Sequence, residues 1–313
     1  MHSLRGALKH NVGHLNVDRE ANAARSGEAG ASNLYPGERT GRPWLFPNIS
    51  DRKSFLDSIT YEFGPKDLLG AFFLEASDAV SKRGLTLVAS SLDDLLDVNR
   101  ANAETWLPIV SIFNSELNTI SRDDSYCILG INGAGEVVAT QAVRRFAWTE
   151  TTLADEVQSM RLFYSDPGMK GPGEACTISA PSADRITGSV AYSGAAWYRP
   201  DYRKCGLSSI MPRIARAFAF TKWSTTKTIT LMAEGIVKGG VPERVGYLNV
   251  EWEARFHNNA LAGPRFALLW MDDRHLLTDL ASWLGRTNHP GDARIFRDAI
   301  QPQVDPVIEK RTA

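Results

Sequence analysis

One short basic segment carries residue types that can hold a phosphate or pyrophosphate. Residues 203–209 read RKCGLSS, and an apolar, strand-like stretch precedes them. After them, apolar residues recur three or four apart from Ile210 and Ile214 onward, which predicts an amphipathic helix with Arg213 and Arg216 on its other faces. The first turn of such a helix has unpaired backbone N–H groups and the positive end of the helix dipole, and both attract anions. The glycine allows a ligand to approach the backbone closely, and the two serines can bind oxygen or cap the helix.

The same segment also fits an interpretation without any ligand. A strand, a solvated basic turn and a core helix with ordinary glycine and serine capping would use the same residue types. Both interpretations stay open on these residues alone.

The spacing of the segment resembles a known loop. Arg203-x-x-Gly206-x-Ser208 is similar to the R/Q-x-x-G-x-G/A pyrophosphate loop of the GNAT superfamily of N-acetyltransferases, with Ser208 where that family has glycine or alanine. The resemblance implies that acetyl-CoA or a longer acyl-CoA binds here as co-substrate. It implies a set of cofactor-binding residues, namely Tyr198, Arg203, Lys204, Cys205, Gly206, Leu207, Ser208 and Ser209.

The elements that would position this loop follow a similar order. Apolar and β-branched runs predict strands at 85–90, 126–131, 136–146, 190–198, 228–232, 249–256 and 266–271. Helical spacing predicts helices at 65–81, at 92–113 with a break near Asn102 or Pro108, and at 276–284. Across about residues 84–272 this order is similar to that of the acetyltransferase superfamily. The expected fold class is α/β, with a mixed central sheet flanked by helices and an added N-terminal segment.

Four regions are expected along the chain. Residues 1–45 are rich in Gly, Ala, Asn, Arg and Ser and predict a flexible leader, and 46–83 predict an N-terminal helical extension. The acyltransferase-like domain spans 84–272, and 273–313 form a C-terminal helical tail. Residues 149–187 interrupt the domain with a helix-like stretch and a Gly/Pro-rich stretch. An interruption of this length near a binding edge favours a lid or a specificity element.

The resemblance also implies catalytic residues. A backbone N–H on the fourth strand, here within 195–198, would polarise the thioester carbonyl, and a tyrosine would donate a proton to the departing thiolate. Tyr247, in the sequence RVGY, matches that tyrosine, although an aromatic residue after a glycine also commonly seals a core. Glu234 can orient or deprotonate the amine, or it can be a solvated carboxylate at a strand end. Tyr192 either faces the site or fills the sheet.

Composition limits the compartment and the partners. The 313 residues have a formal charge of −1, which indicates no general attraction to nucleic acid or to an anionic membrane. The chain has no apolar run long enough to span a membrane and no signal-peptide pattern. Its three cysteines are widely spaced, without a zinc-ligand pattern, so no metal is expected. We expect a cytoplasmic protein with reduced thiols, and a homodimer stays open.

These observations predict an acyl-CoA-dependent N-acyltransferase that acts on an amine of a small molecule, peptide or protein. Two alternatives use a similar fold. The first is a non-catalytic module that binds CoA or serves as an interaction surface, and Ser208 favours it. The second is an acyl-CoA-using synthase of a signalling metabolite, although the charged N-terminal signature of such synthases is missing.

Overall fold

The computed structural model describes residues 54–55, 59–257 and 263–287. The predicted leader, the last turn of the predicted domain at 258–262 and the tail beyond 287 lie outside the described residues. The boundaries predicted for these regions therefore stay predictions.

The described strands form one mixed sheet in the order β1-β2-β3-β5-β6-β8-β7-β4. Their bounds are β1 Leu85–Ser90, β2 Ser125–Asn132, β3 Val137–Trp148, β4 Ala175–Ile178, β5 Gly188–Tyr198, β6 Lys227–Ala233, β7 Asn249–His257 and β8 Arg265–Asp272. Within this sheet β5 and β6 pair in parallel, whereas the other pairs are antiparallel. A mixed sheet was expected, and the predicted strands are all present within one or two residues of their expected bounds.

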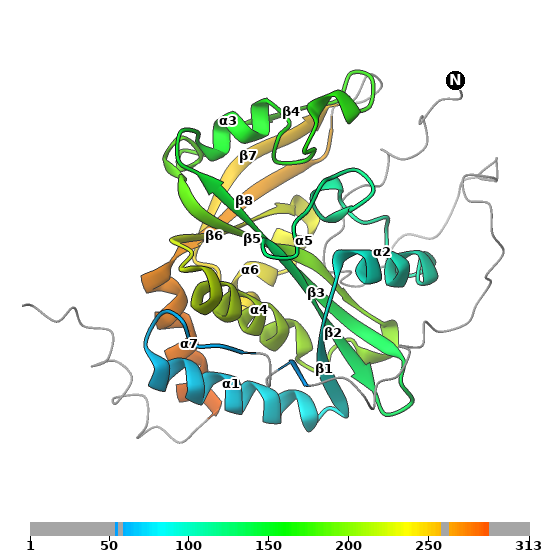
Figure 1. The fold of residues 1–313 in the computed structure, drawn as a ribbon, viewed down its shortest axis with the longest axis vertical. Helices are drawn as coiled ribbons and strands as arrows, with labels where there is room; N and C mark the ends of the chain where they lie inside the picture. Colours follow the sequence, from blue (N-terminus) through cyan, green and yellow to red (C-terminus); the bar gives the residue numbers. More distant parts are fainter. Residues whose placement is uncertain (1–53, 56–58, 258–262, 288–313) are drawn as a thin grey trace, which may run out of the picture.

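Helices cover both faces of the sheet and bury two apolar clusters (Figure 1). One face packs against α1 (Lys66–Ser81), α4 (Leu207–Trp223), α6 (Val241–Val245) and α7 (Asp273–Thr287). The other face packs against α2 (Leu92–Ala101) and α3 (Leu153–Gln158). The short helix α5 (Glu234–Lys238) follows β6 directly. Because side chains alternate along each strand, the same strands supply both clusters. This architecture confirms the expected fold class.

Several of the predicted helices differ in their bounds. The helix predicted at 276–284 is α7, which begins at Asp273 and ends at Thr287. Pro65 is the N-cap of α1, so the helix begins one residue later than predicted. The helix predicted for 92–113 ends at Ala101, and beyond Pro108 only a 3-10 turn forms at Ser111–Phe113. The break predicted near Asn102 is therefore confirmed, since Asn102 is the C-cap of α2. Pro108 disfavours helix in the residue before it, and the chain does not resume the helix there.

Helix α4 is more deeply buried than an amphipathic pattern indicates. Arg213 and Arg216 do lie off its apolar face, as predicted, yet their side chains are only 2% and 1% exposed. Both approach Asp279 of α7, and Arg213 pairs with that carboxylate through two bonds of 2.8 Å. Packing of α7 against the polar side of α4 therefore encloses charges that the sequence pattern would leave in water.

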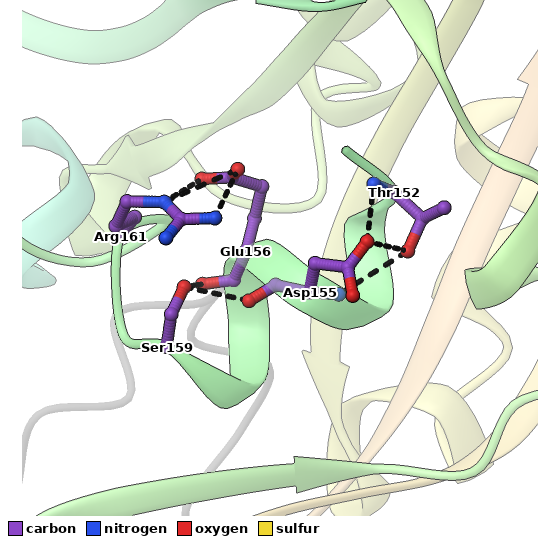
Figure 2. A network of polar contacts seen from close by, with 5 residues as sticks. All are labelled: Thr152, Asp155, Glu156, Ser159 and Arg161. Atoms are coloured by element: carbon purple, nitrogen blue, oxygen red, sulfur yellow. Dashed lines mark hydrogen bonds and ion pairs between the residues drawn. The ribbon is translucent and has the colours of Figure 1, made fainter. Parts of the chain in front are cut away.

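The 149–187 insertion adds an edge strand that the sequence analysis missed. Its strand β4 pairs with β7 at the end of the sheet. Its helix α3 is shorter than the predicted helix-like stretch, because Met160 adopts a left-handed conformation with φ of 65°. Thr152 caps this helix by accepting from the Asp155 backbone N–H, and the Asp155 carboxylate accepts from the Thr152 backbone N–H at 2.8 Å (Figure 2).

Candidate functional site

The parallel pair at the centre of the sheet separates soon after it forms. β5 and β6 are paired only from Val190 to Tyr192 on one side and from Lys227 to Ile229 on the other. The Tyr192 hydroxyl accepts a 3.1 Å hydrogen bond from the Leu231 backbone N–H. Tyr192 thus joins the two strands where their ladder ends, and the later residues of both strands have backbone groups that do not pair with each other.

A β-bulge marks β5 at the same level. Between the pairs Thr140–Trp197 and Ala142–Gly194, β5 contains one residue more than β3, and Ala195 has φ of 51°. Gln141 faces this bulge and donates to Gly194 O at 3.0 Å. It also donates to the Ser193 hydroxyl oxygen at 3.1 Å. The bulge lies in the predicted carbonyl-polarising region, residues 195–198, and changes the direction of its backbone groups.

The segment that leaves β5, residues 199–206, is called the α4 loop here. Lys204 and Gly206 adopt left-handed conformations with φ of 61° and 83°, and Gly206 is the N-cap of α4. No side chain caps this helix, and the Leu207 and Ser208 amides have no acceptor in the described ranges, whereas the Ser209 amide donates to Gly206 O at 3.0 Å. The Ser209 hydroxyl donates to Gly206 O at 2.9 Å. The predicted turn therefore leads directly into the first turn of α4.

Several of the predicted loop residues have structural partners. Arg203 Nε donates to Tyr198 O at 3.0 Å, which ties the loop to the end of β5. The Cys205 thiol donates to Tyr202 O at 2.8 Å. Leu207 is 1% exposed, so its side chain belongs to the core and only its backbone can face a ligand. Ser208 is half-buried at the second position of the helix.

Arg83 also lies at this loop, and sequence reasoning missed it. Its Nε donates to Cys205 O at 2.5 Å, across a separation of 122 residues. It follows the C-terminal end of α1, and no local pattern in the sequence links it to the loop.

Tyr198, the last residue of β5, is 6% exposed and packs in the same cluster as Leu207 and Cys205. Burial raises the pKa of its phenol well above the usual value, and the nearby Cys205 thiol adds to the increase. Within the part of the chain that the structure describes, its hydroxyl has no hydrogen-bond partner. An unpartnered buried hydroxyl is costly, which makes Tyr198 a candidate ligand contact.

Tyr247 packs on the same face of the sheet as α4. It is 3% exposed, and the Arg216 guanidinium carbon lies 4.8 Å from the centre of its ring. Burial raises the pKa of Tyr247, and the nearby Arg216 offsets part of that increase. Among the described residues, no group meets hydrogen-bond geometry with its hydroxyl. The preceding Gly246 has φ of 88°, and its missing side chain leaves room for the Asp279 carboxylate.

Glu234 lies in a separate, more exposed network. Its carboxylate pairs with Lys238 at 2.9 Å and with Arg265 at 3.3 Å. These partners, Lys238 first, lower the pKa of Glu234. No hydrogen bond or ion pair joins Glu234 to Tyr247 in the described ranges. The structure therefore brings together Tyr198 and the loop residues, while the two predicted catalytic side chains lie in different surroundings.

Two searches of the described residues gave negative results. No group of three or more His, Cys, Asp or Glu side chains there could hold a metal ion. No helix there combines the length and the apolar character needed to cross a membrane.

Comparisons with known proteins gave matches among solved structures alone. No protein-family model matches this chain. No curated protein sequence matches it either. The GNAT domain of PAT from S. lividans is 13% identical with a TM-score of 0.33, over 60% of this chain and 90% of that one. A dodecameric spermidine N-acetyltransferase from Vibrio cholerae is 10% identical with a TM-score of 0.38, over 66% and 99%. AAC(6')-Ib, in complex with ribostamycin and coenzyme A, is 11% identical with a TM-score of 0.28, over 49% and 67%.

All three TM-scores lie below 0.5, so the fold assignment rests on the chain's own elements. The described order is β1-α2-β2-β3, the insertion, and then β5-α4-β6-α5-α6-β7-β8. This is the order predicted from the resemblance, apart from the second early helix, which is a 3-10 turn, and the two short helices α5 and α6 where one was predicted. The fold is an α/β architecture with a mixed central sheet, and β4 is an edge strand beyond the predicted order.

Proposed function

We propose that this chain is an acyl-CoA-dependent N-acyltransferase. One observation carries the proposal: the parallel strands β5 and β6 separate after three residue pairs, and β5 then leads through a left-handed loop into the uncapped start of α4. An anion site at a helix start and unpaired strand edges beside it suit a ligand with a diphosphate and an extended amide-containing arm. The amides of α4 would hold the diphosphate, and the strand edges would pair with the arm.

The proposed chemistry uses groups near the bulge. A backbone N–H of residues 195–198 stabilises the oxyanion that forms when an amine attacks the thioester. The departing thiolate takes a proton from the Tyr247 hydroxyl. Glu234 orients the neutral amine or accepts its proton through water. Its lowered pKa makes its carboxylate a weak base and favours the orienting role, in which water takes the proton that the amine loses.

The proposed acceptor is an amine of a small molecule, a peptide or a protein, and the donor is acetyl-CoA or a longer acyl-CoA. The catalytic unit spans residues 84–272, and its 149–187 insertion contributes to acceptor choice. The proposed compartment is the cytoplasm. These assignments extend the expectations from the sequence.

A second candidate function is a CoA-binding module without catalytic activity. The ion pairs of Glu234 favour it, because both of its partners compete with a substrate amine. So does the burial of Tyr247. Release of free thiol from acetyl-CoA in the presence of a panel of amines separates the two functions, since only the enzyme produces it above the hydrolysis background.

The test of the site is the substitution Gly206→Glu. It places a carboxylate at the start of α4 and forces a side chain into a left-handed conformation. We expect CoA affinity in calorimetry to fall by about 100-fold or more, because the charge repels the diphosphate and occupies its place. The matched control is Gly135→Glu, which has a similar φ of 80° in the β2–β3 hairpin and open space around it. Equal CoA affinity in the wild type and in Gly206→Glu would refute the proposed site.

A further inference from the structure

Helix α1 precedes the acyltransferase-like domain, and its function is not explained by the proposed reaction. It packs against α4 and α7 on one face of the sheet (Figure 1). Shortly after its end, Arg83 extends to the α4 loop and donates to Cys205 O. A second bond, from Arg83 Nη1 to Ala79 O, holds the guanidinium against its own helix. The end of α1 thus fixes a cation at the loop.

The guanidinium lies directly against the start of α4. A side-chain carbon built on Gly206 would stand 3.2 Å from Arg83 Nη2. This nitrogen therefore sits beside the positive end of the α4 dipole, where the Leu207 and Ser208 amides have no acceptor among the described residues. Two positive features side by side repel each other unless an anion lies between them.

No acidic side chain supplies that negative charge. Among the described residues, no carboxylate forms an ion pair with Arg83. The neighbouring Lys82 differs from Arg83, because its exposed side chain forms an ion pair with Asp78 at 2.6 Å. The positive charge at the start of α4 is thus uncompensated within the described chain.

The other arginines of the loop are already engaged. Arg199 pairs with Glu136 at 2.8 Å and with Asp201 at 2.8 Å. Arg203 donates to the carbonyl of Tyr198. Arg83 is thus the arginine at this loop whose Nη2 has no acceptor in the described ranges.

A buried hydroxyl at the same loop independently lacks a partner. Tyr198 packs in one cluster with Leu207 and Cys205, and its phenol oxygen is fully enclosed without a hydrogen bond to any described residue. An anion at this loop would give the Arg83 guanidinium the acceptor that it lacks in the described ranges.

We propose that Arg83 binds the diphosphate of the acyl-CoA co-substrate and that α1 is thereby part of the co-substrate site. This inference rests on the proposed function and adds a residue from outside the 84–272 unit. Through Cys205 O, Arg83 also fixes the loop in the conformation that exposes the α4 amides. The guanidinium suits a diphosphate because its planar N–H groups can bond two oxygens at once.

The experiment measures the binding of CoA and of pantetheine, which lacks the diphosphate, to the full chain by calorimetry. Arg83→Gln should weaken CoA binding by about tenfold or more, because a charge-assisted contact is lost, and should leave pantetheine binding unchanged. The loss should shrink as salt is raised, because salt screens the lost ionic contact. The matched control is Lys82→Gln, which removes an adjacent exposed cation and should change neither affinity. Arg83→Lys keeps the positive charge but lacks the planar set of N–H groups. We expect it to give an intermediate loss of CoA affinity and an unchanged melting temperature.

Two results would overturn the proposal. One is equal CoA affinity in the wild type and both Arg83 variants. The other is an equal loss for CoA and pantetheine, which would mean that Arg83 only supports the loop. A wild-type protein that binds no CoA would instead refute the proposed function itself, so the two failures are distinguishable.

Discussion

The insertion that precedes β5 and the α4 loop that follows it use their charged groups differently. In the insertion, polar groups satisfy one another: Arg161 donates to both carboxylate oxygens of Glu156, as Figure 2 shows. The buried Glu174 accepts from the Tyr164 hydroxyl at 2.8 Å and from the Gly171 N–H at 2.7 Å. At the start of α4, by contrast, the Leu207 and Ser208 amides and the Arg83 Nη2 have no acceptor in the described part of the chain.

This difference indicates which end of β5 is prepared for a ligand. A satisfied network adds stability and needs no further partner. Unsatisfied donors beside an unpaired cation cost free energy in the empty protein, and an anion recovers that cost when it binds. The end of β5 that enters α4 is therefore the end that we propose as the ligand site.

The largest expected effect concerns Tyr247. If its hydroxyl donates the proton to the thiolate, Tyr247→Phe should lower kcat by about 10²–10⁴-fold, with little change in CoA affinity or melting temperature. Steady-state kinetics with acetyl-CoA and a reactive amine measure this. An unchanged kcat in this variant would mean that the Tyr247 hydroxyl has no catalytic role and that the side chain only packs in the core.

The control for Tyr247 is Tyr126→Phe. Tyr126 is also a buried tyrosine on the α4 face, and its hydroxyl donates to Ala215 O. Its loss should cost about 1 kcal/mol of stability and leave kcat unchanged, because Tyr126 belongs to the core.

The next prediction concerns the stability that the Asp279 carboxylate of α7 gives to the buried arginines of α4. Asp279→Ala leaves Arg213 and Arg216 buried without their carboxylate, so we expect the free energy of unfolding to fall by about 3–5 kcal/mol. Urea unfolding measures the change. The control is Asp272→Ala, the last residue of β8 directly before α7. Its partly exposed ion pairs and the bond that it accepts from His275 N–H should together contribute about 1–2 kcal/mol. Similar losses in both variants would contradict the assigned role of the Asp279 cluster.

The exposed turn of the insertion should affect the acceptor rather than the co-substrate. Replacing Pro167–Lys170 with two glycines removes this turn and spares the buried contacts of Glu174. We expect the ratio of kcat/KM between two amines of different size to change by about five- to tenfold, with CoA affinity unchanged. Identical acceptor profiles before and after the replacement would show that the turn has no part in selectivity.

The smallest expected effect is at the start of α3. Thr152→Ala removes the cap that Figure 2 shows and should cost about 1 kcal/mol of stability, without any change in CoA affinity. Thermal unfolding measures it, with Thr151→Ala as the neutral control. A change in CoA affinity in the Thr152 variant would mean that the insertion is coupled to the loop and would weaken the contrast between the two ends of β5.

Local signals in the sequence were sufficient for most of the sheet. The strand predicted at 85–90 has the bounds of β1, and the Asn132–Gly135 turn joins β2 and β3 as predicted, with Gly135 N–H donating to Asn132 O at 2.9 Å. Gly206 marks the start of α4 in both the sequence and the structure. These features depend on residues close together in the chain, whose conformational preferences do not need a distant partner. Part of the candidate site, the turn that opens α4, could therefore be predicted.

The rest of the site depends on contacts between distant residues. The sequence by itself determined where each principal strand runs and where the turn that opens α4 lies. Only the tertiary structure decided that β5 and β6 separate beside that turn, that Asp279 buries the charges of Arg213 and Arg216, and that Arg83 reaches Cys205. The physical reason is that these outcomes follow from the packing of whole helices on the sheet. Such packing joins elements that are far apart in the sequence, and a local sequence pattern carries no information about which elements meet.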